Sequence, residues 1–210
     1  MPKARKPPRP KRAAPAARKP ASAARARAQA DVARADPALF GPLTEGEHAD
    51  ALRTLLEDER LRSMAKVGRY RVITVEPLVI KPPENLAGRR LARVVIYDYA
   101  GDRCVDACVD LDHGAVCYVG TSTAQPMLSP DEEAEAIAVA MRDERVSRGI
   151  ALGDGPLCAM HYWSRRAADL AYRRRAAAVL LGPPSGPPAI VAVVDLMDNV
   201  VVEVVAAAQW

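Results

Sequence analysis

The sequence contains an internal repeat, spaced 85 residues, that runs without gaps from about Leu43 to Val205. Asp58-Glu59-Arg60 returns unchanged as Asp143-Glu144-Arg145, and Ala107-Cys108-Val109-Asp110-Leu111 returns as Ala192-Val193-Val194-Asp195-Leu196. The match extends over a helical pattern upstream and a strand pattern downstream. The chain therefore carries two copies of one supersecondary unit, which constrains the fold more than any other feature.

Each copy predicts one helix followed by four strands. Thr44 and Glu47 have the spacing of a capping box, and apolar residues at helical spacing follow to about Leu61. The second copy opens with Ser129 and Pro130, and its helix is expected to end near Arg148. A polar stretch at 164–175 allows a further helix. Strands are expected at about 70–75, 91–99, 104–111 and 115–119, and again at about 157–163, 176–181, 189–196 and 200–205.

This order favours an α+β fold in which each unit packs its helix on one face of a four-stranded antiparallel sheet. The segment 189–196 is apolar on both faces, with Val191 and Val193 opposite Ile190, Ala192 and Val194. A strand of this kind is usually covered on both sides. We expect the helix on one side and the sister unit or a partner on the other.

Residues 1–38 form a low-complexity tail of Ala, Pro, Lys and Arg that we expect to be disordered. Residues 1–30 hold ten of the 30 basic residues and none of the 26 acidic ones, so residues 31–210 carry 20 basic and 26 acidic groups. The candidate polyanion-binding residues are Lys3, Arg5, Lys6, Arg9, Lys11, Arg12, Arg18, Lys19, Arg25 and Arg27.

Such a polycation neutralises phosphates without sequence preference, and its lack of aromatic residues argues against base stacking. Three other interpretations stay open: a tail that folds back on the acidic body, a solvated leader, or translation of GC-rich DNA from a start codon placed too far upstream. No apolar run approaches the roughly 18 residues that span a bilayer, and the N-terminus lacks a secretory signal. We predict a cytoplasmic protein with reduced cysteines and no membrane partner.

The order of several short motifs resembles the N-terminal domains of copper amine oxidases. Pro42 to Glu47, Tyr70 to Pro77, Val109 to Leu111 and Gln125 to Met127 are similar to motifs of the second such domain. Those similar to the third are Arg148 to Ile150, Cys158 with Trp163, and Val191 to Leu196. The resemblance implies two cystatin-like domains, at 42–125 and 126–207, after the tail at 1–38.

The resemblance also implies what this chain lacks. In that family a large C-terminal domain holds three histidine copper ligands, an aspartate base and the tyrosine that becomes topaquinone. This chain has three histidines in all and no His-x-His pair, so no catalytic, cofactor or metal residue is carried over. We expect no enzyme activity from the chain alone and no cofactor. The first hypothesis is a non-catalytic accessory module that binds a protein partner or associates with itself through a sheet face. The alternatives are a nucleic-acid-associated protein, and a fragment or separate subunit of an amine oxidase whose catalytic half acts in trans.

Other candidate residues have structural interpretations. Ile96-Tyr97-Asp98-Tyr99 is superficially similar to the cofactor motif, but Ile96 replaces the asparagine, and we expect the tyrosines to cap a core edge. His48 and the segment His161-Tyr162-Trp163 have no catalytic partner at a supporting spacing.

Cysteine and aspartate residues of the first unit raise the question of a metal site. Cys104, Cys108 and Cys117, with His113, suggest zinc, but the repeat places apolar residues at the cysteine positions, as it does for Cys158. A two-residue hairpin would set Cys108 opposite Cys117. Asp106, Asp110 and Asp112 suggest a cation site, although Asp110 and its copy Asp195 stand where a strand enters a turn, a place for bonding local backbone.

Overall fold

The computed structural model describes residues 39–81, 84–164, 167–169 and 171–210, and all ten basic residues of the predicted tail site lie outside these ranges. The first unit consists of α2 (Glu45–Glu57), α3 (Arg62–Val67), β1 (Tyr70–Leu78), β2 (Leu91–Asp98), β3 (Arg103–Asp110) and β4 (Ala115–Ser122). The second consists of α4 (Pro130–Arg142), α5 (Glu144–Gly149), β5 (Gly155–His161), β6 (Ala176–Gly182), β7 (Ile190–Asp195), β8 (Val200–Ala206) and the 3-10 helix η2 (Ala207–Gln209).

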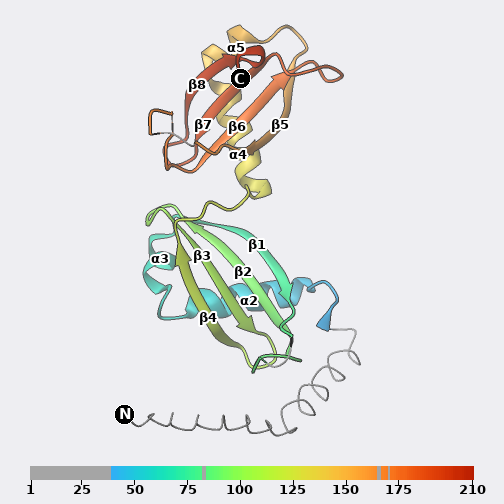
Figure 1. Ribbon diagram of the computed structural model, residues 1–210, viewed down its shortest axis with the longest axis vertical. Coiled ribbons are helices and arrows are strands. Elements are labelled where there is room, and N and C mark those ends of the chain that lie inside the picture. The colour runs from blue at the N-terminus through green and yellow to red at the C-terminus, as the bar shows by residue number, and fades with distance from the viewer. Residues whose placement is uncertain (1–38, 82–83, 165–166, 170) are drawn as a thin grey trace, which may run out of the picture.

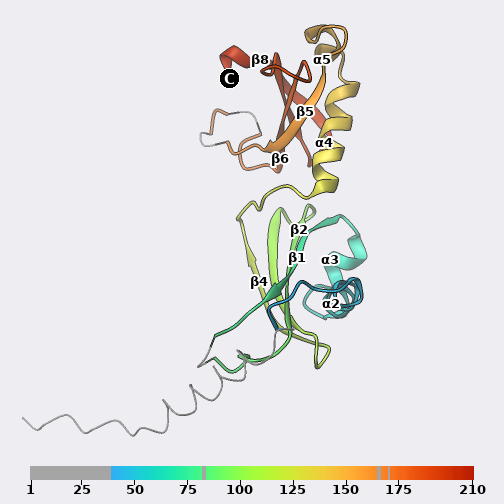
Figure 2. The same ribbon diagram turned by 90° about the vertical axis from the view of Figure 1, so that its right-hand side faces the viewer.

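Each unit forms its own antiparallel sheet, in the strand orders β1-β2-β3-β4 and β5-β6-β7-β8. The long helices α2 and α4 pack on one face of their sheets, so the predicted α+β fold of two tandem repeats is confirmed. The units stand end to end (Figure 1), and both long helices lie on the same side of the molecule (Figure 2). The two faces without a helix therefore also share one side.

The two long helices begin and end by the same local chemistry. Thr44 and Ser129 each cap an N-terminus, and the glutamate at the third helical position bonds back to the cap in both. The expected continuation to Leu61 and Arg148 is wrong, because Asp58 and its copy adopt extended backbone. A short second helix follows each break.

The aspartates at these breaks also protect a sheet edge. Asp58 holds the guanidinium of Arg60 at 2.7 Å, and Arg60 donates to the carbonyl oxygen of Val116 in the edge strand β4. The copied pair, Asp143 and Arg145, does the same to a carbonyl of β8. An edge carbonyl that is already hydrogen-bonded is less available to another chain. The arginine of each repeated Asp-Glu-Arg segment therefore covers one carbonyl group of an edge strand.

One strand pairing and one connecting segment differ from the sequence-based prediction. A β-bulge between Cys108 and Val109 places Tyr118, not Cys117, opposite Cys108, because the bulge adds one residue on β4. In the described part of the polar stretch, residues 164, 167–169 and 171–175, the chain forms turns, bends and irregular backbone rather than the helix we allowed. Among the described residues, no helix is long and apolar enough to cross a membrane.

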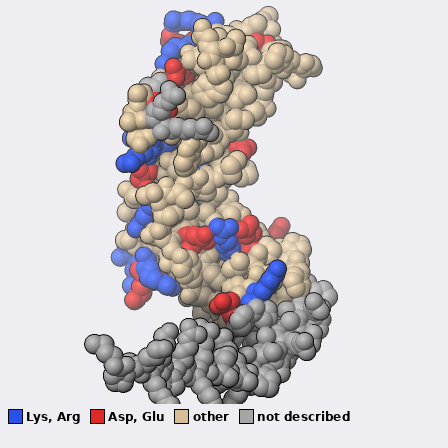
Figure 3. Space-filling model, viewed as in Figure 1, with Lys and Arg blue, Asp and Glu red and all other residues tan. Residues whose placement is uncertain are grey.

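The cores lie between each sheet and its long helix, and the opposite side, on which no long helix packs, is here called the uncovered face. In the second unit the C-terminal segment also contacts β7, and the ring centre of Trp210 lies 5.6 Å from that of Tyr162. In the second unit Ile190, Ala192 and Val194 belong to the helix-side core, as expected. Val191 and Val193 are also buried, on the uncovered face. The sister unit does not cover them, since it stands at the end of this sheet (Figure 1). Uncharged residues predominate over this side of the molecule, although charged side chains cross the lower sheet (Figure 3).

Candidate interaction site at the junction of the two units

A glutamate–arginine pair anchors the start of the long helix in each unit. In the first unit the guanidinium of Arg90 binds the carboxylate of Glu47 with N–O distances of 2.7 and 3.1 Å, and Glu47 accepts from the Thr44 amide. In the second unit Arg175 binds Glu132 at 2.8 Å through both of its oxygens. We call Thr44, Glu47 and Arg90 the first clamp, and Ser129, Glu132 and Arg175 the second clamp.

Both arginines also hold the segment that precedes the helix. Arg90 donates to the carbonyl oxygens of Gly41 and Pro42 at 3.0 and 2.9 Å. Arg175 donates to those of Pro126 and Met127. Every member of the second clamp stands 85 positions after its counterpart, and so do the carbonyls. The same clamp thus occurs in both units. In each unit it fixes the segment before the long helix to the start of the second strand of the sheet.

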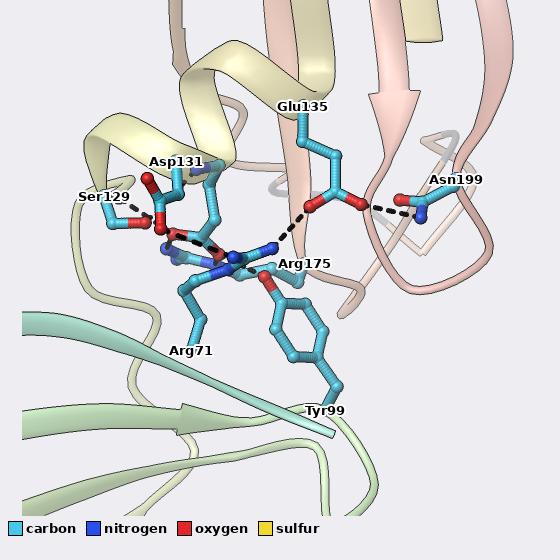
Figure 4. A network of polar contacts seen from close by, with 8 residues as sticks. Arg71, Tyr99, Ser129, Asp131, Glu135, Arg175 and Asn199 are labelled. Atoms are coloured by element: carbon cyan, nitrogen blue, oxygen red, sulfur yellow. Dashed lines mark hydrogen bonds and ion pairs between the residues drawn. The ribbon is translucent and has the colours of Figure 1, made fainter. Parts of the chain in front are cut away.

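The surroundings of the two clamps differ. The side chains of Arg175 and Glu132 are 0% exposed, whereas those of Arg90 and Glu47 are 12% and 27% exposed. The first unit supplies the cover: the Tyr99 hydroxyl donates to Glu132 at 2.5 Å, and the Arg175 guanidinium lies 4.9 Å from the centre of the Tyr97 ring. Figure 4 shows Tyr99 reaching up from the first unit to the second clamp.

The two tyrosines form one aromatic contact at the end of the first sheet. Their ring centres are 5.2 Å apart in an edge-on arrangement, and both rings join the core of the second unit. Tyr97 also donates to Asp102 at 2.6 Å. We expected the tyrosines to cap the edge of a core. The structure goes further, because the two rings belong to a core that spans both units. Burial, with the hydrogen bonds to Asp102 and Glu132, raises the pKa of both phenols.

Electrostatics favours the ionised form of the second clamp. Burial by itself would raise the pKa of Glu132, but Arg175, the Tyr99 hydroxyl and the Ser129 amide stabilise the carboxylate and bring that pKa below its ordinary value. At neutral pH the junction therefore contains a buried carboxylate held by a buried guanidinium. Such a pair is tolerated only when its hydrogen bonds are satisfied, which makes the junction dependent on correct docking of the two units.

Charged groups at the rim add contacts between the units. Arg71 of β1 binds Glu135 of α4 at 2.6 Å and lies 3.5 Å from Asp131. Glu135 also accepts from Asn199 at 2.8 Å (Figure 4). Arg69 donates to the carbonyl oxygen of Met197. The rim thus ties the first strand of one unit to the helix and the last hairpin of the other.

The structure separates the other candidate residues. Cys104 and Cys108 are buried, Cys117 and Cys158 are exposed, and burial raises the pKa of the two buried thiols. No group of three or more His, Cys, Asp or Glu side chains suited to a metal ion is found within the described ranges.

The aspartates bond to backbone amides or arginines, and His161 contacts a glutamine. Asp110 accepts from the amide of His113 and pairs with Arg89, and Asp195 accepts from the amide of Met197, so both bond local backbone as expected. Asp106 pairs with Arg93, and Asp112 accepts from the amide of Arg90. His161 faces Gln125 at 3.0 Å, and burial followed by the nearby Arg175 lowers its pKa. His48 is half-buried in α2.

Reasoning from the sequence missed the two arginines of the clamps. The repeat pairs Glu47 with Glu132, and it also pairs Arg90 with Arg175. An acidic and a basic residue that both recur at the repeat spacing could have indicated a repeated ion pair. Burial of the second clamp had no such signal, because Tyr97 and Tyr99 correspond to Gly182 and Pro184 in the other copy.

Comparison with known proteins gives structural likeness but no match in sequence. No protein-family model matches the sequence, and no curated protein matches it. Among solved structures, a copper-containing benzylamine oxidase from Hansenula polymorpha is similar with a TM-score of 0.47 and 12% sequence identity. The match covers 80% of this chain and 30% of that one, so this chain spans less than a third of the length of the oxidase.

Proposed function

We propose that this chain is a non-catalytic interaction module whose two units are locked together so that their uncovered faces form one surface for a second copy of the chain. The observation that carries the proposal is a partly exposed apolar strip on the uncovered face of the second unit. Met160 of β5 is 47% exposed, and Leu180 of β6 and Val205 of β8 are half-buried beside buried Val191 and Val193. Glu203 of β8 pairs with Val193 and adds a charge to this face. Exposed apolar side chains that gather on one face commonly mark a protein contact.

The junction supports this proposal because it sets the orientation of the two faces. The second clamp, the two tyrosines and the Arg71 rim join the units, and the helices then lie on one side and the uncovered faces on the other (Figure 2). A surface spread over two units is useful to a partner only if the units keep one orientation.

Charge on the first unit's uncovered face favours a second copy as the occupant. Arg93 lies between Glu76 and Asp106, with N–O distances of 2.9 and 2.7 Å to the two carboxylates. A row of mixed sign can face another copy of itself without net repulsion, whereas a row of one sign could not. A two-fold dimer uses the same patch on both subunits.

Self-association tests the proposal directly. We expect sedimentation equilibrium of the full chain to show a dimer, and Met160→Glu to shift the population to monomer because it places a charge in the apolar contact. Leu152→Glu is the matched control, since Leu152 is fully exposed in the loop before β5. A chain that stays monomeric at all concentrations, or a dimer that Met160→Glu leaves intact, contradicts the proposal.

The charge of the tail favours a second candidate function. Ten basic and no acidic residues within residues 1–30 support salt-sensitive binding of nucleic acid. A salt titration with DNA and RNA, comparing the full chain with a chain that begins at Asp31, tests it. Binding that is lost with residues 1–30 and weakens steeply with salt is the expected result. Equal binding by both chains, or none at low salt, contradicts it.

The hypothesis of a subunit that acts with a separate catalytic half stays a prediction. Its test is oxidation of a primary amine that requires both chains and copper.

A further inference from the structure

A cavity of about 710 Å³ opens beside the junction. Its volume lies within the range of about 300–1,000 Å³ that is typical of small-molecule sites. The first unit, the linker and the second unit all contribute to its wall. The lining residues are Asp102, Thr123, Gln125, Trp163, Ser164, Tyr172, Arg173 and Arg174. The cavity therefore exists only in the docked arrangement of the two units.

The wall contains backbone held in an unfavourable conformation. Arg173 has φ of 59° and the neighbouring Ala171 has φ of 54°, both in the left-handed region that residues with a Cβ rarely adopt. The Ser164 hydroxyl and the Arg174 amide both donate to the Ala171 carbonyl oxygen, and these bonds help to hold the segment. Strain of this kind concentrates at binding and catalytic sites, because the surrounding fold must sustain it.

The charged side chains of the wall are not equivalent. Arg174 pairs with Asp195 and Asp198, and Asp102 accepts a hydrogen bond from Tyr97. Arg173 is exposed, and its guanidinium lies 5.3 Å from the centre of the Tyr172 ring. No carboxylate contact of Arg173 is recorded among the described residues. A planar guanidinium supported on a ring is suited to binding a carboxylate or a phosphate through two hydrogen bonds.

An aromatic surface stands in the same wall. Trp163 is 57% exposed, and its ring centre lies 5.7 Å from that of His161. Exposed tryptophan beside a cavity provides a large flat surface for a planar ligand. We propose that the cavity binds a small aromatic anion, with its ring on Trp163 and its carboxylate or phosphate on Arg173.

A series of ligands with one ring and different charges tests this site. Benzoate and phenyl phosphate are the anionic probes, benzamide is the neutral one and benzamidine is the cationic one. Binding is followed in the full chain by the NMR signal of the Trp163 indole N–H. Trp210→Phe assigns that signal, because the chain has two tryptophans. Comparing benzoate with phenyl phosphate shows which anionic group the site prefers.

We expect both anions to shift the Trp163 signal and to bind more tightly than benzamide. Arg173→Gln should weaken the anions about tenfold, the equivalent of one charge-assisted contact, and leave benzamide unchanged. Arg142→Gln is the matched control, since Arg142 is an exposed arginine at the end of α4. The proposal is overturned by tighter binding of benzamidine, which would make Asp102 the dominant charge. It is also overturned if Arg173→Gln has no effect, if the Trp210 signal alone moves, or if no probe binds at millimolar concentration.

Discussion

The two clamps share the same glutamate–arginine pair and a hydroxyl cap, Thr44 or Ser129, but their environments differ. Glu47 and Arg90 remain partly exposed, whereas Glu132 and Arg175 are buried beneath two tyrosines of the neighbouring unit. The same ion pair is therefore a surface anchor in one copy and the centre of an interface in the other. A repeat can therefore reuse one set of helix-capping residues and change their role solely through what docks against them.

The docking residues are those at which the repeat is broken. Tyr97 and Tyr99 stand where the second copy has Gly182 and Pro184. The end of the first unit can thus cover a clamp, and the corresponding end of the second unit lacks both rings. The contact is therefore asymmetric, because the end of the first unit carries the tyrosines that contact a neighbouring unit and the corresponding end of the second unit does not.

The largest expected difference between the clamps concerns their arginines. Arg175→Met leaves the Glu132 carboxylate buried without its counter-ion, and we expect it to lower the free energy of unfolding by about 3–5 kcal/mol. Arg90→Met should lower it by about 1–2 kcal/mol, because water reaches Glu47. Urea denaturation followed by far-UV circular dichroism measures both. Equal losses would show that burial does not distinguish the clamps.

Loss of the Tyr99 hydroxyl should have the next largest effect on stability. Tyr99→Phe keeps the ring but removes the donor to Glu132, and we expect a loss of about 1–2 kcal/mol in the free energy of unfolding. Tyr118→Phe is the control, since Tyr118 is exposed on β4 and its hydroxyl should contribute little. An unchanged free energy in Tyr99→Phe would mean that the ring alone makes the interface.

Acid should weaken both clamps. Arg90, then the Thr44 amide, lowers the pKa of Glu47 to about 2, and that of Glu132 is also below its ordinary value. A carboxyl with a folded-state pKa below its unfolded value stabilises the fold above the unfolded pKa, and this contribution is lost as pH falls toward the folded pKa. We expect the free energy of unfolding to fall between about pH 4.5 and 2. Glu47→Gln should reduce that slope, and an identical slope would contradict the role of Glu47.

The rim should contribute least. Arg71 and Glu135 are each about one-third exposed, so Arg71→Ala should change the free energy of unfolding by less than about 1 kcal/mol. The small loss should shrink further in high salt, because screening weakens an exposed ion pair. A loss as large as that of Arg175→Met would place the main coupling of the units at the rim. The free energies at low and high salt decide between these results.

Local features could be predicted because they depend on short stretches of chain. The repeat, the capping residues and the alternation of apolar residues indicated two helix-plus-sheet units, and the structure confirms them. The break at Asp58 and the bulge at Cys108 were not predicted. At the break the Asp58 carboxylate accepts from the backbone amide of Arg60, and at the bulge one extra residue enters the ladder, and neither leaves a periodic signal.

The sequence by itself determined the unit, its copy number and the groups that start each helix, because hydrophobic period and capping act within a few residues. Only the tertiary structure decided that Tyr97 and Tyr99 bury the second clamp, that Arg71 meets Glu135, and that the linker, Trp163 and Arg173 line one cavity. The physical reason is that burial depends on which surfaces meet. Two identical sequence patterns can differ completely in their exposure to water once one of them is docked.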